Sequence, residues 1–193
     1  MVGLTGAVLA GGKSSRFGTN KALYVNDGKS LLQQSLEILQ SLCDQLCISA
    51  NSSNAVAYKD MGADIICDLH PDCGPLGGIE AIVNACHTEQ LLILTCDMPL
   101  ITADILHSMI TASHSRVDEC HDGPPSAVAW QSADGNLMPL PLLLHRNSFQ
   151  AIGQQIQAGD LKMKHLLTLI DCKLLPIDDD RYFANINRLN DLK

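Results

Sequence analysis

Residues 4–23 read LTGAVLAGGKSSRFGTNKAL, and this stretch decides the fold prediction. Its first part, Leu4–Leu9, is apolar enough for a buried strand, which ends at Gly11 and Gly12. Neither glycine has a Cβ atom, so backbone N–H groups there can approach an anion closely. Three cations follow in the same loop: Lys13, Arg16 and Lys21. The sequence therefore predicts a phosphate-binding loop directly after the first strand.

The loop differs from two widespread nucleotide-binding patterns. Neither the Walker A sequence G-x-x-x-x-G-K-[S/T] nor the dinucleotide sequence G-x-G-x-x-G occurs there. A triphosphate needs backbone amides for orientation and cations for charge, and this loop offers both. The planar guanidinium of Arg16 can chelate phosphate oxygens, whereas Lys21 acts as a point charge. Both residues are therefore predicted to be catalytic.

Apolar periodicity along the chain predicts strands that alternate with helices. The expected strands are 4–9, 45–50, 63–67, 91–95, 126–131 and 137–144, the last two joined by a hairpin at Asp134-Gly135. The expected helices are 30–43, 78–86, 102–112, 147–157 and 162–170, with a loop at 113–125. Ser30 and Thr102 are expected N-caps. This alternation predicts an α/β fold with a mostly parallel sheet, in a single domain over residues 1–193.

Polar residues follow several of the expected strands. Ligands of such sheets gather outside the carboxyl ends of the strands, so one edge is expected to hold the loop, Asn51, Asp68 and Asp97. Asp97 follows the most apolar strand, and Mg²⁺ typically binds one or two carboxylates together with substrate phosphates. We therefore predict Asp97 as a Mg²⁺ ligand. From spacing alone, Asn51 and Asp68 fit turn residues equally well.

The composition excludes several classes of protein. A formal net charge of −8 argues against broad nucleic-acid binding, which needs a basic surface. The sequence has no secretory signal and no apolar run of the roughly 20 residues that span a bilayer, so no membrane association is expected. Several of the eight cysteines lie in apolar runs, as buried free thiols do. Reduced thiols favour a cytoplasmic protein.

Residues 9–21, LAGGKSSRFGTNK, resemble the L-A-G-G-x-S-x-R-M-G-x-D-K signature of the MobA-like nucleotidyltransferases. The resemblance implies a Rossmann-like three-layer αβα sandwich. It also implies transfer of GMP from GTP to the terminal phosphate of molybdopterin, which forms the guanine dinucleotide of the molybdenum cofactor, and contact with other proteins of that cofactor's synthesis. Phe17 stands where the family commonly has Met, and Asn20 where it commonly has Asp, so no carboxylate role carries over to residue 20.

Further motifs extend this resemblance along the chain. Cys96-Asp97-Met98-Pro99 is similar to the family's C-D-x-P motif, which carries the metal aspartate. Gly74–Gly78 resembles its G-P-L-A-G segment, and Asn185-Ile186-Asn187 resembles its N-x-N motif near the pterin. The resemblance thus implies catalytic Arg16, Lys21 and Asp97. It implies nucleotide, metal or pterin contacts from Leu9, Ala10, Gly11, Gly12, Lys21, Asn51, Asp68, Asp97, Asn185 and Asn187.

Three other functions remain open at this point. The first is a cytidylyltransferase acting on molybdopterin or another phosphorylated acceptor. Such relatives more often have A-A-G where this chain has Ala10-Gly11-Gly12, and this difference favours guanine. The second is a non-catalytic nucleotide-binding module of the same fold, against which the presence of Lys21 and Asp97 argues. The third is a flavodoxin-like binding domain, whose phosphate loops need no such run of cations.

Overall fold

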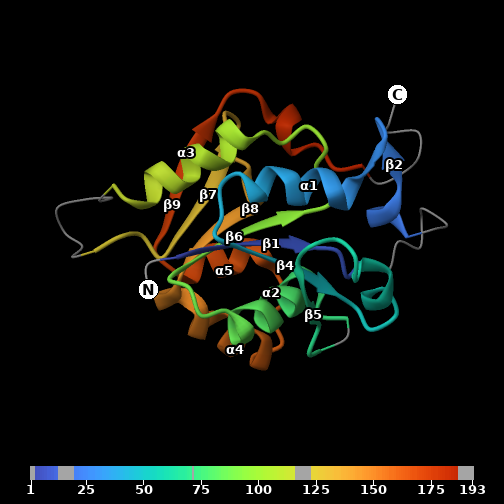
Figure 1. Cartoon of the computed structure of the whole chain (residues 1–193). Coiled ribbons are helices and arrows are strands. Elements are labelled where there is room, and N and C mark those ends of the chain that lie inside the picture. The colour runs from blue at the N-terminus through green and yellow to red at the C-terminus, as the bar shows by residue number, and fades with distance from the viewer. Residues whose placement is uncertain (1–2, 13–19, 71, 116–122, 187–193) are drawn as a thin grey trace.

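A seven-stranded sheet forms the middle layer of the computed structural model, which describes residues 3–12, 20–70, 72–115 and 123–186 (Figure 1). The strand order is β5-β4-β1-β6-β8-β7-β9. The strands are β1 (Leu4–Leu9), β4 (Gln45–Ala50), β5 (Asp64–Cys67), β6 (Gln90–Thr95), β7 (Ala127–Ser132), β8 (Leu137–His145) and β9 (Cys172–Ile177). The sequence predicted every one of these strands except β9.

The sheet is mostly parallel, as predicted. Strand β1 pairs in parallel with both β4 and β6, and β4 does so with β5. Strand β8 pairs antiparallel with β6 and with β7, whereas β9 pairs in parallel with β7. The chain builds outward from β1 to β4 and β5, then returns to place β6 on the other side of β1. This reversal of strand order is where open α/β sheets bind their ligands.

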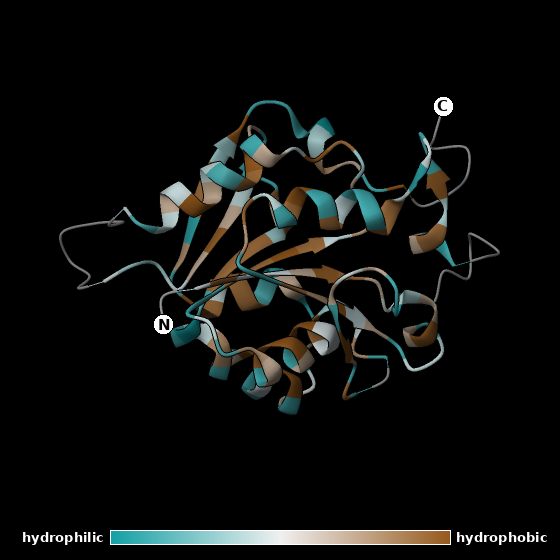
Figure 2. Ribbon diagram, in the orientation of Figure 1, coloured by the Kyte–Doolittle hydropathy of each residue, from teal (hydrophilic) through white to brown (hydrophobic). Residues whose placement is uncertain are grey.

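Helices cover both faces of the sheet (Figure 1). One face carries α1 (Leu31–Gln40) and α3 (Ala103–Ser113), and the other carries α2 (Gly74–Ala85), α4 (Phe149–Gln157) and α5 (Met163–Leu169). Their apolar faces turn toward the sheet (Figure 2). Residues 91–94 of β6 are completely buried, as expected for a strand covered on both sides. The expected three-layer sandwich is therefore confirmed.

Several predicted boundaries need correction. Helix α1 ends at Gln40 rather than near residue 43, and Ser113 is the buried last residue of α3 rather than part of a loop. Helix α2 begins at Gly74, four residues before the predicted start, with Pro75 in its first turn, where its missing N–H costs no helical hydrogen bond. The glycine-rich segment is thus the start of the helix rather than a turn before it. The N-caps Ser30 and Thr102 are confirmed.

A small hairpin beside the sheet was not predicted. Strands β2 (Val25–Asn26) and β3 (Lys29–Ser30) pair antiparallel around Asp27 and Gly28, whose φ angles of 52° and 82° suit a tight hairpin turn. The hairpin follows the short helix η1 (Lys21–Leu23). Three further short helices are η2 (Ala55–Tyr58), η3 (Arg146–Ser148) and η4 (Asp180–Phe183). None of the helices in the described ranges is long and apolar enough to cross a membrane.

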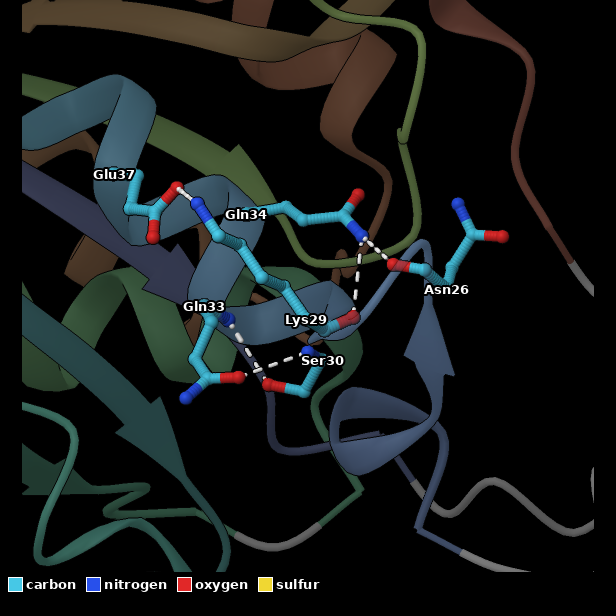
Figure 3. Close-up of polar contacts among 6 residues, drawn as sticks. All are labelled: Asn26, Lys29, Ser30, Gln33, Gln34 and Glu37. Atoms are coloured by element: carbon cyan, nitrogen blue, oxygen red, sulfur yellow. Dashed lines mark hydrogen bonds and ion pairs between the residues drawn. The ribbon is translucent and has the colours of Figure 1, made fainter.

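Polar contacts fix the hairpin to the start of α1 (Figure 3). The Ser30 side chain accepts from the Gln33 N–H at 3.2 Å, and the Gln33 side chain accepts from the Ser30 N–H at 2.9 Å. The amide of Gln34 donates to the carbonyls of Asn26 at 2.6 Å and Lys29 at 3.2 Å. This capping box and the two added bonds hold the hairpin in a defined position on α1. Because η1 directly precedes the hairpin, the same contacts constrain the segment that carries Lys21.

Candidate active site

The register of the sheet brings three strand ends to one level. Leu9 of β1 lies opposite Ser49 of β4 on one side and Thr95 of β6 on the other. Two residues further along each chain come Gly11, Asn51 and Asp97. Residues in equivalent positions of neighbouring parallel strands lie side by side, so the sequence's expectation of a single polar edge is confirmed for these residues.

Lys21 and Asp97 meet at this edge. Their Nζ and Oδ2 atoms are 2.8 Å apart, although 76 positions separate the two residues in the chain. Their side chains are only 13% and 22% exposed. A charged pair that is largely shielded from water interacts more strongly than a surface pair. The cation of the predicted phosphate loop and the predicted metal carboxylate therefore share one site.

The second oxygen of the Asp97 carboxylate is buried, and among the described residues it has no hydrogen-bond partner. The hydroxyl of Thr95, two residues earlier, is in the same condition. A buried polar atom without a partner is costly, and a carboxylate oxygen in that condition suits a cation ligand. The described residues contain no cluster of three or more His, Cys, Asp or Glu that could hold a metal alone. The described part of this site thus offers one buried carboxylate oxygen without a partner, that of Asp97, which suits an ion that takes most of its other ligands from a substrate.

Cys96 lies between these two residues and is buried. Burial, and then the neighbouring Asp97 carboxylate, raise the pKa of its thiol to about 12. A thiol with so high a pKa stays protonated at neutral pH, which argues against a role as a nucleophile.

Asp68 is held against the glycine turn. Its Oδ1 atom accepts a 2.7 Å hydrogen bond from the Ser49 hydroxyl, and the Asn51 amide donates to the Gly11 carbonyl at 2.9 Å. A Cβ atom on Gly11 would lie 2.8 Å from Asp68 Oδ2 and 3.3 Å from the Asn51 backbone nitrogen. Glycine is therefore required at position 11 because the carboxylate and the neighbouring strand approach its Cα so closely. Asn51 and Asp68 thus contact the glycine turn at this edge of the sheet, and Asn51 also forms a turn with Asn54.

The C-terminal segment returns to the same edge. The N–H of Ile186 donates to the Asp97 carbonyl at 2.9 Å, which brings the exposed Asn185 next to the carboxylate's own backbone. The Ile186 side chain is buried in a small cluster with Leu31 and Tyr24. This contact links the backbone of Asp97 to the start of α1 and to the residue that follows η1.

Comparisons with known proteins identify the family of this chain. The model of the MobA-like NTP transferase domain matches residues 6–173. This chain belongs to the MobA-like NTP transferase family. A probable molybdenum cofactor guanylyltransferase of Flavobacterium johnsoniae is 30% identical over 98% of this chain and 96% of that protein. A molybdenum cofactor guanylyltransferase of Bordetella pertussis is also 30% identical, over 98% of this chain and 95% of the relative.

Solved structures show the same fold. The crystal structure of molybdopterin-guanine dinucleotide biosynthesis protein A from Archaeoglobus fulgidus superposes with a TM-score of 0.76. It is 21% identical, and the match covers 97% of this chain and 94% of that one. At this identity the likeness shows the fold alone.

The structure of this MobA-like NTP transferase brings most of the predicted site residues to one edge of the sheet. These are Leu9, Ala10, Gly11, Gly12, Lys21, Asn51, Asp68, Asp97 and Asn185. Lys13, Arg16 and Asn187 lie outside the described residues. The roles of all these residues in binding and catalysis stay predictions.

Two residues of the site escaped the sequence analysis. Ser49 holds Asp68, and Ile186 binds the backbone of Asp97. Ser49 could have been noticed as a hydroxyl at the carboxyl end of an otherwise apolar strand, two positions before Asn51. Ile186 carried a weaker signal, as a single apolar residue between two asparagines. The contact of Ile186 with Asp97 joins segments 89 positions apart, and no local pattern encodes it.

Proposed function

We propose that this chain transfers GMP from GTP to the phosphate of molybdopterin, which forms the molybdopterin guanine dinucleotide and releases pyrophosphate. The proposal depends chiefly on the 2.8 Å contact between Lys21 and Asp97 at the edge of the sheet. The contact supports the proposal because Lys21 can neutralise phosphates and the neighbouring Asp97 can bind Mg²⁺. The names of the relatives, molybdenum cofactor guanylyltransferases, support GTP and molybdopterin as the substrates.

The proposed chemistry is a direct in-line displacement. An anionic oxygen of the acceptor phosphate attacks the α-phosphorus of GTP, and the bond between that phosphorus and the α,β-bridging oxygen breaks. The new bond joins the two phosphates of the dinucleotide, and pyrophosphate carries away the bonding electron pair. The attacking oxygen is already ionised, so no strong general base is needed. Catalysis then depends on positioning and charge neutralisation.

Five residues have a stated part in this proposal. The backbone amides at Gly11 and Gly12 orient the phosphates, and Lys21 neutralises charge that develops on them. Arg16 shares that task on the strength of the family resemblance. Asp97 would hold Mg²⁺, and its buried oxygen without a hydrogen-bond partner is available for this. When bound, Mg²⁺ would neutralise the phosphates and favour departure of pyrophosphate.

The setting proposed for this reaction is the cytoplasm. Cys47 and Cys96 are buried in or beside apolar strands as free thiols, which supports a reducing compartment.

A pyrophosphate-release assay tests the function. The protein is incubated with Mg²⁺, molybdopterin and each of GTP, CTP, ATP and UTP in turn. We expect turnover with GTP alone, and none when molybdopterin is omitted. Turnover with CTP instead would establish a cytidylyltransferase. Binding of GTP without turnover would establish a non-catalytic nucleotide-binding module.

A substitution tests the metal carboxylate. Asp97→Asn keeps the shape of the side chain and an acceptor for Lys21 but removes the charge. We expect turnover to fall by about 100-fold or more, as for loss of a group that stabilises transition-state charge. Asp64→Asn is the matched control, because Asp64 is an exposed aspartate at the start of β5, on the opposite edge of the sheet. Near wild-type turnover in Asp97→Asn would show that Asp97 holds no catalytic metal.

A further inference from the structure

Tyr58 is a completely buried tyrosine that the proposed mechanism does not use. It is the last residue of η2, which follows β4 and Asn51. Asn51 binds this segment to β4, because its carbonyl accepts from the N–H groups of Asn54 and Ala55 at 3.0 and 3.1 Å. The tyrosine ring lies in the main core. The hydroxyl is the only polar group of this side chain, and a buried tyrosine hydroxyl usually has a hydrogen-bond partner. The partners of this hydroxyl therefore indicate the role of Tyr58.

The Tyr58 hydroxyl meets two different segments of the nucleotide site. It lies 3.2 Å from the carbonyl oxygen of Ala10, at the end of β1, and 3.0 Å from Oδ1 of Asn20. Its single proton is shared between these two acceptors. Burial is the main cause that raises the pKa of this phenol, so the hydroxyl remains a donor at neutral pH. One buried atom thus joins the end of the first strand to the residue just before Lys21.

Asn20 passes this constraint on to Lys21. The same Oδ1 atom accepts from the N–H of Ala22 at 3.1 Å, which makes Asn20 the N-cap of η1. Helix η1 has three residues, and Ala22 is its buried member. A helix this short has little stability of its own and depends on its caps and tertiary contacts. The position of Lys21, the first residue of η1, therefore depends on the oxygen that Tyr58 holds.

We propose that Tyr58 is a positioning residue of the nucleotide site. Its hydroxyl fixes the N-cap of η1 relative to the end of β1, and this holds Lys21 at Asp97. Tyr58 makes no contact with the reacting atoms in this scheme and acts through Asn20. The catalytic consequence rests on the proposed function, whereas the effect on the Lys21–Asp97 distance does not.

At residue 20, the presence of an acceptor oxygen should matter and the charge of the side chain should not. What Tyr58 and the Ala22 N–H require from residue 20 is an acceptor oxygen. Aspartate supplies that oxygen and alanine does not. Asn20→Asp should therefore keep Lys21 in place, and Asn20→Ala should release it in the same way as Tyr58→Phe.

The experiment compares Tyr58→Phe, Asn20→Ala and Asn20→Asp with the wild type. The matched control is Ser113→Ala, which removes a buried hydroxyl that also has two partners, the carbonyl of Ile110 and the amide of Gln90, away from the site. We expect Tyr58→Phe and Asn20→Ala each to lower kcat/KM for GTP about tenfold, as for one lost hydrogen bond. Asn20→Asp and Ser113→Ala should stay near the wild type. The double variant Tyr58→Phe/Asn20→Ala should lower kcat/KM by much less than the product of the two single-variant factors, because both substitutions break the same linkage.

Three readouts separate the possible failures. If wild-type protein turns over GTP and Tyr58→Phe keeps the same kcat/KM, Tyr58 only packs the core and the inference is wrong. If wild-type protein shows no turnover, the proposed function fails, and calorimetric titration with GTP and Mg²⁺ still compares the variants. A crystal structure of ligand-free Tyr58→Phe decides the geometry whatever the reaction. A Lys21–Asp97 pair still at 2.8 Å would overturn the inference, and a separation beyond hydrogen-bond distance would support it.

Discussion

Gly11→Ala should destabilise the protein because the glycine turn is pressed against Asp68. The added Cβ atom would lie 2.8 Å from Asp68 Oδ2, whereas ordinary contact begins at 3.4 Å. It would also lie 3.3 Å from the backbone nitrogen of Asn51, which cannot move without disturbing the end of β4. The side chain of Asp68 is therefore the group that must yield.

The size of the effect follows from the bond that holds Asp68. The carboxylate has to retreat by about 0.6 Å to restore ordinary contact. Its other oxygen is bound to the Ser49 hydroxyl at 2.7 Å, and a displacement of that size takes the pair out of good hydrogen-bond geometry. A hydrogen bond to a charged group contributes about 1.5–3 kcal/mol. We expect Gly11→Ala to lower the free energy of unfolding by about 2 kcal/mol.

Urea denaturation, followed by circular dichroism, measures this loss. Gly12→Ala is the matched control, because a Cβ atom at Gly12 meets no atom of the described residues within 4 Å and Gly12 is exposed. We expect Gly12→Ala to stay within about 0.5 kcal/mol of the wild type. In the pyrophosphate assay, Gly11→Ala should also raise the KM for GTP, because the displaced carboxylate lies at the proposed nucleotide site.

A double-mutant cycle tests the cause. In a Ser49→Ala background the Asp68 carboxylate has already lost its hydroxyl donor, so adding Gly11→Ala should cost less than in the wild type. Equal stability of Gly11→Ala and Gly12→Ala would refute the reasoning. The same holds if the cost of Gly11→Ala is unchanged when Ser49 is replaced.

Two further predictions concern packing and pH. Gly78→Ala should lower the free energy of unfolding in urea by about 1–3 kcal/mol, because its Cβ atom would overlap the Ser49 hydroxyl and crowd Leu9. Gly153→Ala, where the Cβ atom would make only an ordinary contact with Glu80 at 3.9 Å, should raise it by up to about 1 kcal/mol. Equal effects of the two substitutions would show that α2 can shift. Burial raises the pKa of Cys47 from 9.0 to about 12, so its contribution to stability is complete below pH 9 and is lost as the pH rises to 12. Between pH 9 and 11, the free energy of unfolding of Cys47→Ala should therefore fall by about 2 kcal/mol less than that of the wild type. Parallel profiles of unfolding free energy against pH would contradict this.

The parallel part of the sheet could be predicted because its strands carry strong local signals. Strands β1 and β6 are nearly continuous apolar runs, and β4 matched its predicted bounds. Strands of this kind must be covered on both faces, which determines the class of fold. Once their order is known, the ends of β1, β4 and β6 coincide, and the polar residues after them are neighbours by geometry.

Strand β9 could not be predicted because its sequence has a low intrinsic propensity to form a strand. Its sequence, CKLLPI, includes Lys173 and Pro176 and is only partly buried. It forms at the end of the strand order through pairing with β7, and the Lys173 ammonium reaches the Ala112 carbonyl at 3.2 Å. Proline is tolerated in such an edge strand. The tertiary contacts, rather than the sequence pattern, make this segment a strand.

The start of α2 was misplaced for a related reason. Two of its first five residues, besides Gly74 itself, are glycines, and glycine disfavours helix by about 1 kcal/mol relative to alanine. A sequence argument therefore starts the helix after them. In the structure, the absent side chain of Gly78 is what lets α2 lie against Ser49 and Leu9. The close packing of α2 against the strands outweighs the low helix propensity of glycine. Glycine is needed at position 78 because a Cβ atom there would overlap Ser49.

The pairing of Lys21 with Asp97 has a consequence for the charge of the site. The chain carries a net charge of −8, and a triphosphate adds more negative charge. A cation that already faces a carboxylate at 2.8 Å contributes no net positive charge to that edge. Under the proposed function, Lys21 still acts locally on the phosphates, but the excess positive charge must come from Mg²⁺ together with Lys13 and Arg16, which the sequence places within the same nine positions as Lys21. An acidic protein can bind a triphosphate on these terms because the cations that matter follow the first strand closely in the sequence, and screening confines the effect of distant charges to about 10 Å.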